Sequence, residues 1–365
     1  MHEFPAFGES AIDQKEEKPH INVPMEGPGK LGYTMPAEWD RHRGTILTWP
    51  QRNGVSFPPP YDAGVAETYI ELIEHLSAVE EVHINLFDDY EIGMVEKLLA
   101  KSKADRERVF LHHHPSYEPW CRDHGPIVVK HRETGEIAVT DWKYNAWGDK
   151  YPPYDLDNTI PARMAEVLGC RRFVSDMVLE GGSIEVNGCG DLVTTEACLL
   201  NPNRNPDMNR QQIEARLRDF LGVDRIHWLG DGIEGDDTDG HIDDLTRFVD
   251  ESTLVTVMEH SSTDPNAAIL RENRDRLEAI GRFEIIDLPM PDPVILDGHR
   301  LPASYANFYI ANELVLVPTF NQTGDEKALG ILRDCFPGRK VCGVDSRALI
   351  FGLGSFHCIT QQIPA

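Results

Sequence analysis

GLGSFHCITQQ, residues 352–362, lies at the end of the 365-residue chain and combines small residues, a thiol and a short β-prone run. We predict that the β-prone run closes back on the first structural unit of the chain. We also predict that Cys358 is a nucleophile. A cysteine taken at random is more often a buried structural residue. The catalytic interpretation therefore depends on what the rest of the chain brings to this thiol.

Upstream of this stretch, a helical pattern is followed by a β-prone run five times. Each pattern has the spacing of a helix and ends at a glycine or another small or breaking residue. The helical patterns cover residues 65–79, 161–169, 209–222, 264–281 and 325–338. The β-prone runs cover residues 82–86, 173–174, 226–229, 283–286 and 341–344.

A hairpin pattern precedes four of these helices. The expected strand pairs are 127–129 with 137–142, 183–186 with 192–195, 245–249 with 254–258, and 305–310 with 314–317. Residues 349–351 and 356–360 would form the last pair and complete the first unit. The sequence thus predicts an α/β fold, a closed five-bladed propeller of ββαβ units, with residues 90–114 as an added helix and strand. We expect one domain over residues 31–365, preceded by a flexible or surface-draped arm, residues 1–30.

Composition narrows the functional classes. The formal charge is 35 − 61 = −26, which disfavours nucleic acid as a partner and favours small cations. We expect no membrane span, because no apolar run approaches about 20 residues. We expect no secretion signal, because residues 1–30 hold acids, glycines and prolines and lack an apolar core. The seven cysteines form no CxxC pair, which fits a reducing compartment, and we expect a cytoplasmic protein. The sequence does not fix the oligomeric state; a homodimer or a higher homo-oligomer is compatible with it.

Potentially catalytic residues occupy one equivalent place, immediately before the first strand of a unit. The three stretches are WCRDHGP, residues 120–126; EGG, residues 180–182; and DGHIDD, residues 239–244. Equivalent positions in a closed ring face the same region, so these side chains should converge near the axis. Taken singly, each stretch is also an ordinary turn signal. Their common register, with a thiol on the closing strand, favours a functional site.

A thiol, a histidine and several carboxylates suit the hydrolysis of a guanidinium group. Paired carboxylates match the forked N–H donors of this planar cation. Its central carbon is a weak electrophile, so it needs a thiolate as nucleophile and a histidine that protonates the departing amine. A nearby positive charge must activate the thiol, and the bound guanidinium or a protonated histidine could provide it.

From residue 32 to the C-terminus, the chain resembles the agmatine deiminases, which belong to the guanidine-modifying pentein superfamily and are related to bacterial-type peptidylarginine deiminases. The matching stretches are MPAEW 35–39, WP 49–50, WCRDHGP 120–126, NAWG 145–148, KYPPY 150–154, EGGS 180–183, NRNP 203–206, TDGHID 238–243, PASY 302–305, NFY 307–309 and HCITQQ 357–362. The resemblance implies a five-bladed α/β propeller, in agreement with the unit count above. The chain departs from the family at Leu353, which interrupts a run of glycines.

The resemblance also implies roles for five residues. Cys358 would be the nucleophile and would form a covalent amidino-thioester. His241 would protonate the leaving ammonia and then activate water. Asp123 and Asp243 would bind the guanidinium, and Glu180 would be a third acid at the same centre. The implied enzyme is a hydrolase of C–N bonds in linear amidines. It would convert agmatine to N-carbamoylputrescine and ammonia for putrescine and polyamine biosynthesis, without metal or organic cofactor.

Substrate contacts and alternatives complete the expectations. Trp120 would form an aromatic wall and Trp39 a rim residue. Asp237, with its acidic neighbours in the same loop, could hold the distal amine of agmatine, or it could belong to a solvated acidic loop. A peptidylarginine deiminase is the alternative reaction, and a non-catalytic binding module is the alternative class. We do not interpret His112-His113-His114 as a metal site, since adjacent residues of a strand face opposite sides and only His112 and His114 align.

Overall fold

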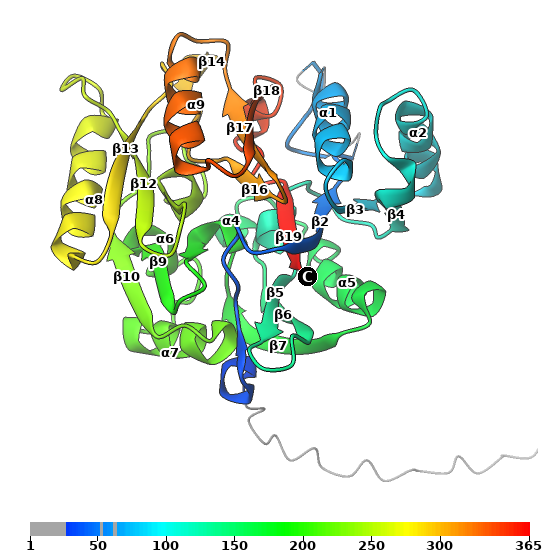
Figure 1. Cartoon of the computed structure of the whole chain (residues 1–365), viewed down its shortest axis with the longest axis horizontal. Helices are drawn as coiled ribbons and strands as arrows, with labels where there is room; N and C mark the ends of the chain where they lie inside the picture. Colours follow the sequence, from blue (N-terminus) through cyan, green and yellow to red (C-terminus); the bar gives the residue numbers. More distant parts are fainter. Residues whose placement is uncertain (1–26, 52–53, 61–63) are drawn as a thin grey trace, which may run out of the picture.

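Each of the five predicted ββαβ units forms its own small sheet in the structure, a computed structural model that describes residues 27–51, 54–60 and 64–365 (Figure 1). In every unit, two strands pair antiparallel, and a helix leads from the second strand to a third that runs parallel to it. A parallel pair requires such a crossover. The prediction of a five-bladed α/β propeller is confirmed.

The first unit is completed by the C-terminal strand, which pairs antiparallel with β2. Its elements are β19 (Thr360–Pro364), β2 (His42–Thr48), α1 (Val65–Ser77) and β3 (Glu81–Leu86), extended by α2 (Asp89–Leu99), η2 (Arg106–Arg108) and β4 (Val109–His113). This unit contains the added helix and strand that the sequence predicts. Because β19 comes from the end of the chain, the ring is closed by backbone hydrogen bonds between the two ends of the described chain.

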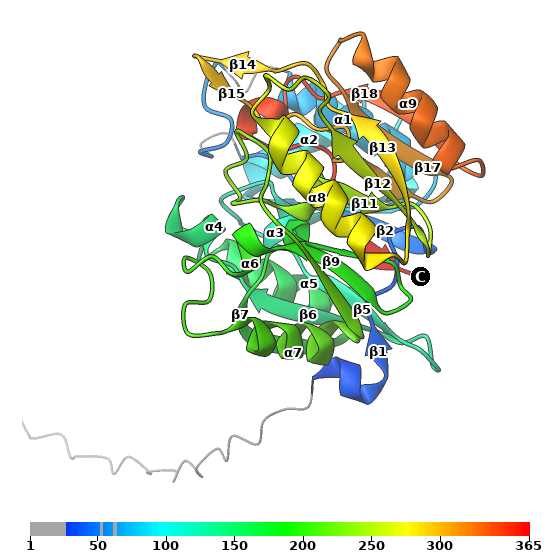
Figure 2. The same cartoon turned by 90° about the vertical axis from the view of Figure 1, so that its left-hand side faces the viewer.

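The other four units follow in chain order (Figures 1 and 2). The second contains β5 (Ile127–His131), β6 (Ile137–Lys143), α5 (Ile160–Leu168) and β7 (Arg171–Val178), with β1 (Tyr33–Thr34) on its edge. The third contains β8 (Ile184–Val186), β9 (Asp191–Thr195), α7 (Arg210–Leu221) and β10 (Arg225–Leu229). The fourth contains β11 (Thr246–Phe248), β12 (Thr253–Met258), α8 (Asn266–Ile280) and β13 (Glu284–Pro289). The fifth contains β16 (Tyr309–Ala311), β17 (Leu314–Thr319), α9 (Gly324–Cys335) and β18 (Lys340–Asp345).

Short elements lie between the units and within them. They are η1 (Pro28–Leu31), α3 (Cys121–His124), α4 (Ala146–Asp149), η3 (Asp157–Thr159), η4 (Gly181–Ser183), α6 (Glu196–Leu199), η5 (Ile242–Asp244), η6 (Ile350–Gly352) and the hairpin of β14 (Ile295–Leu296) with β15 (His299–Arg300). Three of them, α3, η4 and η5, stand directly before the first strands of the second, third and fourth units, and they contact one another in series. The predicted equivalent positions therefore do meet near the axis.

Local signals explain the helix ends. The Asn209 side chain accepts a hydrogen bond from the backbone N–H of Gln212, and the Gln212 side chain accepts one from the backbone N–H of Asn209, which is a capping box at the start of α7. The helix ends at Gly222, whose φ of 64° is left-handed and suits glycine. Along α1, the spacing of Tyr69, Leu72 and Leu76 buries one face of the helix.

Two strand predictions at the axis are wrong. Residues 350–352 form the turn η6, and the closing strand starts only at Thr360, where the predicted strand 356–360 ends. Similarly, β16 starts at Tyr309 instead of residue 305. In both places the chain turns before entering the strand, because backbone N–H groups there bond to loop carbonyls, for example Ile359 to Ser355 and Asn307 to Ser304. These turns are the counterparts of α3, η4 and η5.

The predicted arm lies mostly outside the described residues, which begin at residue 27. Its last part forms η1, which packs on α7, with Lys30 paired to Asp219 at 3.6 Å. Within the described part of the chain, no helix combines the length and the apolar character needed to cross a membrane.

Candidate active site

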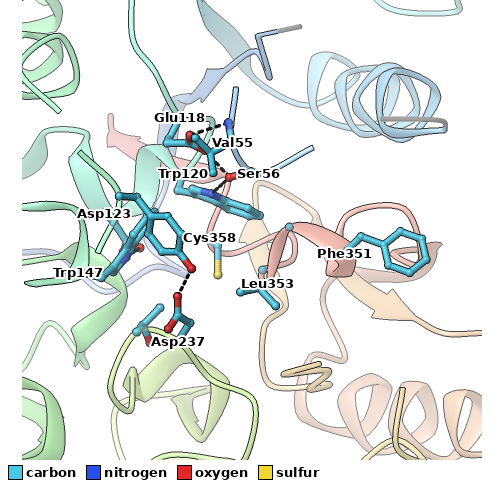
Figure 3. Close-up of a pocket in the computed structure, with 14 residues that line it drawn as sticks. Val55, Ser56, Glu118, Trp120, Asp123, Trp147, Asp237, Phe351, Leu353 and Cys358 are labelled. Carbon is cyan, nitrogen blue, oxygen red and sulfur yellow. Dashed lines mark hydrogen bonds between the residues drawn. The ribbon is translucent and has the colours of Figure 1, made fainter. Parts of the chain in front are cut away.

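A cavity of about 130 Å³ opens where the turns before the first strands meet, and Cys358 lies in its wall (Figure 3). The sulfur of Cys358 points into the space between Trp120, Asp237 and Leu353. The lining residues are Val55, Ser56, Glu118, Trp120, Asp123, Trp147, Tyr151, Asp237, Thr238, Phe351, Gly352, Leu353, Gly354 and Cys358. They come from segments spread over the whole described chain, so the closed ring is what assembles the cavity.

The turn before β19 presents the Cys358 thiol to this cavity. Its Sγ accepts a hydrogen bond from Asn307 Nδ2 at 3.1 Å and lies 3.8 Å from Asp243 Oδ2. Burial raises the pKa of the Cys358 thiol well above its ordinary value, and Asp243, Asp244 and Asp123 raise it further. In the free protein the thiol therefore keeps its proton, and a cation in the cavity would be needed to favour the thiolate.

Asp123 and Asp243 form a buried pair of carboxylates on either side of one histidine nitrogen. His241 Nδ1 lies 3.8 Å from Asp123 Oδ1 and 4.0 Å from Asp243 Oδ1. Asp123 accepts hydrogen bonds from Trp147 Nε1 and from the Gly182 backbone N–H, both at 3.0 Å. Asp243 Oδ1 has no hydrogen-bond partner among the described residues. Asp123 lines the cavity, whereas Asp243 and His241 lie next to its lining. A cationic N–H donor that reached the unpartnered oxygen of Asp243 would satisfy it.

The two carboxyl groups differ in acidity. Burial raises the pKa of Asp123 to about 6; the charge of His241 opposes this rise, while Asp243 and Glu180 add to it. Burial also acts to raise the pKa of Asp243, but the hydrogen bond and charge of His357 outweigh it and the pKa falls below its usual range. At neutral pH both groups are mainly ionised, and Asp123 is the one that protonates first on acidification.

His241 is held in place by its backbone. Its N–H donates to Asp236 Oδ2 at 3.1 Å and to Thr238 Oγ1 at 3.2 Å. Burial opposes a charge on the ring, but Asp123, Cys198 and Asp243 outweigh burial and raise the pKa of His241 well above 6.5. The ring is therefore a cation at neutral pH and can donate a proton to a leaving group.

Gly182 lets these groups come together. A Cβ on Gly182 would lie 2.6 Å from His241 Nδ1, 2.9 Å from Asp123 Oδ1 and 3.1 Å from Asp243 Oδ2. No side chain fits at that place, so the glycine before the strand is required by close approach.

Glu180 lies outside the lining of the cavity. It is fully buried, and its Oε1 accepts a hydrogen bond from Arg204 Nε at 2.5 Å. Glu180, Cys198 and His241 each offer a potential metal-ligating atom, and these atoms lie within 4.8 Å of one another. This is the one such group of three among the described residues. Glu180 thus contributes to the centre from behind the histidine.

Sequence reasoning assigned no role to His357, and the structure places it beneath the acid pair. Its Nδ1 lies 2.6 Å from Asp243 Oδ2, and its Nε2 lies 2.8 Å from Glu38 Oε2. Glu38 in turn pairs with Arg122 and Arg247. This buried network fixes the orientation of Asp243. A signal was present, since Glu38 and His357 both lie in stretches that carry the family resemblance.

Of the two predicted tryptophans, the structure brings only Trp120 to the cavity. Its ring packs so closely on the backbone that a Cβ at Gly354 would lie 2.4 Å from it, and its Nε1 donates to Ser56 Oγ at 2.8 Å. Trp39 instead lines a separate hollow with Arg339, so its assignment to the rim is corrected. The physical reason is that Glu38 turns into the buried network, which directs the neighbouring side chain away from the site.

Two acids stand at the outer part of the cavity. Asp237 accepts a hydrogen bond from the Tyr151 hydroxyl and lies 3.5 Å from Lys150 Nζ. Glu118, which sequence reasoning missed, accepts hydrogen bonds from the Val55 backbone N–H at 3.1 Å and from the Ser56 hydroxyl. Burial raises the pKa of Glu118. Leu353 completes the wall from a left-handed backbone position with φ of 72°, which is unusual for leucine.

The histidine run on β4 behaves as predicted for alternating strand residues. His112 and His114 stack on one face with ring centroids 5.2 Å apart, while His113 faces Asp89. Burial lowers the pKa of His112 and of His114 to about 4.

The pKa of Asp123 leads to a first prediction. We expect kcat/KM for a cationic guanidine substrate to fall as the pH decreases through about 6, and to drop about tenfold per pH unit below it, because protonated Asp123 no longer pairs with the cation. The guanidinium itself does not titrate in this range. The value of kcat should fall only at lower pH, since bound substrate holds Asp123 ionised. Coincident profiles of kcat and kcat/KM, measured where the protein stays folded, would contradict this assignment.

Comparison with known proteins places the chain among deiminases. A sequence model for "Porphyromonas-type peptidyl-arginine deiminase" matches residues 34–364. A Selenomonas ruminantium protein named "Putative agmatine deiminase" is 38% identical over 365 residues, which cover 92% of this chain and 96% of that protein. Two solved structures are also similar. A cysteine-to-serine variant of C. jejuni agmatine deiminase with substrate bound has a TM-score of 0.84 and 30% identity, covering 91% of this chain and 96% of that one.

The second is the agmatine deiminase of Enterococcus faecalis, with a TM-score of 0.86 and 28% identity, covering 94% of this chain and 98% of that one. Both similarities extend over more than nine-tenths of the chain. The chain therefore belongs to the Porphyromonas-type peptidyl-arginine deiminase family, within the guanidine-modifying pentein group that contains the agmatine deiminases.

Proposed function

We propose that this protein hydrolyses agmatine to N-carbamoylputrescine and ammonia through a covalent intermediate on Cys358. The observation that carries the proposal is the buried pair of Asp123 and Asp243: Asp123 lines the same small cavity as the thiol, and Asp243 Oδ2 lies 3.8 Å from Cys358 Sγ. A planar, permanently charged guanidinium matches two carboxylates, and each charge-assisted hydrogen bond is worth about 1.5–3 kcal/mol. The product would enter putrescine and polyamine biosynthesis.

In the proposed first step, the bound guanidinium lowers the cost of ionising Cys358, and the thiol proton passes to solvent. The thiolate attacks the central carbon and forms a C–S bond, and the imidazolium of His241 donates a proton as the C–N bond breaks and ammonia leaves. In the second step, neutral His241 accepts a proton from water, which attacks the amidino-thioester. The C–S bond then breaks and releases the ureido product and the thiol. Glu180 and Arg204, behind the ring, would hold His241 in place.

The acids at the outer part of the cavity support a substrate with a distal amine. Asp237 and Glu118 lie along the cavity that ends at Cys358. The carboxylate of free arginine would meet these acids, whereas the primary amine of agmatine would pair with them. A cavity of about 130 Å³ is smaller than the ~300–1,000 Å³ of pockets for drug-sized ligands, which also favours a compact substrate.

The deciding experiment is a colorimetric assay for ureido product on agmatine, free arginine and a blocked arginyl peptide. Turnover of agmatine with little or no turnover of the other two supports the proposal. Preferential turnover of the peptide would keep the thiol chemistry and change the substrate class to peptidylarginine. Absence of turnover with all three, in protein shown to be folded, would favour a binding module.

The contribution of Asp237 can be measured separately. We expect Asp237→Asn to lower kcat/KM for agmatine about tenfold, which corresponds to about 1.4 kcal/mol, a modest value because this carboxylate is one-third exposed. The effect on butylguanidine, which lacks the amine, should stay within about twofold. Glu234→Gln is the matched control, since Glu234 lies in the same loop but is exposed and does not line the cavity. Equal losses for both substrates would remove Asp237 from amine recognition.

The raised pKa of Cys358 predicts selective labelling by cations. We expect 2-chloroacetamidine to alkylate Cys358 about 100-fold faster than neutral 2-chloroacetamide, after each rate is divided by its rate with glutathione. Two charge-assisted bonds to the amidinium, at about 1.5 kcal/mol each, account for this factor. The preference should shrink in Asp123→Asn. Equal normalised rates would show that the carboxylates do not govern access of ligands to the thiol.

A further inference from the structure

Behind the catalytic histidine lies a cluster of three donors, one of which has no place in the proposed mechanism. Glu180 precedes η4, Cys198 lies in α6, and His241 precedes η5; all three are at least 99% buried. Potential ligating atoms of the three side chains lie within 4.8 Å of one another. The mechanism uses the Nδ1 side of His241, which faces Asp123 and Asp243; Cys198 helps to raise the pKa of His241, but its thiol takes no part in the proposed steps.

Two atoms of this cluster lack partners. Glu180 Oε2 and His241 Nε2 are buried and have no hydrogen-bond partner among the described residues. Arg204 occupies only the other oxygen of Glu180. Buried polar atoms are nearly always satisfied, and an exception calls for a water molecule or an ion. The unpartnered nitrogen, Nε2 of His241, belongs to the side of the imidazole ring opposite Nδ1, which faces the carboxylates of Asp123 and Asp243.

The donor set selects the kind of ion. A thiolate, an imidazole and a carboxylate are the three types of protein ligand that bind zinc, usually in a tetrahedral arrangement. Magnesium and calcium prefer oxygen ligands alone. Ligand atoms of a tetrahedral zinc site lie roughly 3.3–3.8 Å apart, so any pair of the present atoms near the 4.8 Å limit would have to move closer together. The carboxylates of Asp123 and Asp243 beside His241 favour a cation at this place, whereas the Arg204 guanidinium bonded to Glu180 opposes it.

We propose that Glu180, Cys198 and His241 form an inhibitory binding site for one zinc ion. Binding displaces the proton of the Cys198 thiol and the Nε2 proton of His241, and forms Zn–S, Zn–N and Zn–O bonds. The histidine coordinated at Nε2 no longer carries the extra proton that leaving ammonia requires. Zinc bound at Nε2 of the His241 imidazole would therefore block turnover and leave the nucleophile Cys358 chemically unchanged.

The binding experiment uses the full chain, and its principal sample is Cys358→Ala, in which the other site thiol is absent. Equilibrium dialysis should find one tightly bound zinc per chain in wild type and in Cys358→Ala, with Kd values within about threefold. The Cys198→Ser variant should bind at least about 100-fold more weakly, because even indirect supports of a metal site are worth 10–100-fold. Cobalt bound to Cys358→Ala should show a thiolate charge-transfer band, which Cys198→Ser/Cys358→Ala should lack.

Two outcomes would overturn the proposal. Loss of zinc binding in Cys358→Ala with retention in Cys198→Ser would place the metal on the nucleophile. Absence of a tight site in wild type, or of the charge-transfer band in Cys358→Ala, would exclude the cluster even if the Cys198 variants fail to fold. Both readouts are independent of turnover, so they test the metal site separately from the proposed reaction. If agmatine is turned over, zinc should inhibit wild type at least about 30-fold more strongly than Cys198→Ser, each relative to its own zinc-free rate.

Discussion

Replacement of Cys358 by serine is expected to lower the turnover of agmatine by at least about 10⁴-fold, since removal of the nucleophile of a serine protease, which also forms a covalent intermediate, costs about 10⁶-fold in kcat. A serine hydroxyl is far less acidic than a thiol, and Asp243, Asp244 and Asp123 already oppose an anion at this position. The Asp123 and Asp243 carboxylates remain in place, so agmatine should still bind to the variant. Isothermal titration calorimetry should give a Kd for agmatine with Cys358→Ser that lies within about threefold of the Kd with Cys358→Ala, a second inactive variant.

Cys121→Ser is the matched control for this prediction. Cys121 is also buried and lies beside Trp120, but its Sγ donates to the carbonyl oxygens of Ile46 at 3.1 Å and Ile359 at 3.3 Å, away from the cavity. We expect its kcat to change by less than about tenfold. Wild-type protein quenched with acid during turnover should carry an adduct of agmatine minus ammonia on Cys358. Appreciable turnover by Cys358→Ser without this adduct in wild type would rule out the covalent mechanism.

The sequence predicts those parts of the fold that depend on neighbouring residues. The hairpin of β5 with β6 and the capping of α7 by Asn209 follow from alternation, turn residues and caps within a few positions. The turns before β16 and β19 were mistaken for strand because their residues are β-prone. Their backbone is bent by contacts with other units, such as the bond from the His357 N–H to the Asn307 carbonyl, and no local pattern encodes these contacts.

The residues of the candidate site likewise fall into those that the sequence predicts and those that it does not. Asp123, Glu180 and Asp243 could be grouped from the sequence because the units repeat and these acids share one register. Glu38, Glu118 and Asn307 could not be grouped, since each reaches the site from an irregular segment. Trp39 is the opposite case. It is aromatic and lies in a stretch that resembles the family, as expected of a rim residue, but its side chain lines a separate hollow. A position within a repeat predicts convergence, whereas residue type alone does not.

The buried ions beneath the site carry the second large prediction. Arg247 is fully buried; its Nε donates to Glu185 at 2.9 Å, its Nη2 donates to Glu38 at 2.9 Å, and its Nη1 donates to the carbonyl oxygens of Ala306 and Phe308. Its loss would leave two carboxylates without this partner, inside the protein. Removing one member of a buried ion pair costs about 3–5 kcal/mol. We therefore expect Arg247→Met to lower the free energy of unfolding by about that amount, measured from the urea midpoint at unchanged slope.

The same variant should affect catalysis through Asp243. Glu38 accepts hydrogen bonds from both Arg247 and His357, and His357 bonds to Asp243, so an unpaired Glu38 would shift Asp243, the carboxylate that we propose binds substrate. Any Arg247→Met protein that folds should show a raised KM for agmatine. Arg247→Lys keeps the charge but cannot donate to Glu38 and Glu185 in the way the planar guanidinium does. Its free energy of unfolding should therefore lie between those of wild type and Arg247→Met.

An exposed ion pair provides the control for the stability measurement. Arg347 bonds to Asp345, and the two side chains are 54% and 50% exposed. Because water screens such a pair, Arg347→Met should change the free energy of unfolding by no more than about 1 kcal/mol. Glu38→Gln combined with Arg247→Met should cost less than the sum of the single changes, since the double variant no longer buries an unpaired Glu38 charge. Additive costs, or equal effects at Arg247 and Arg347, would show that the buried network does not hold the turns beneath the cavity together.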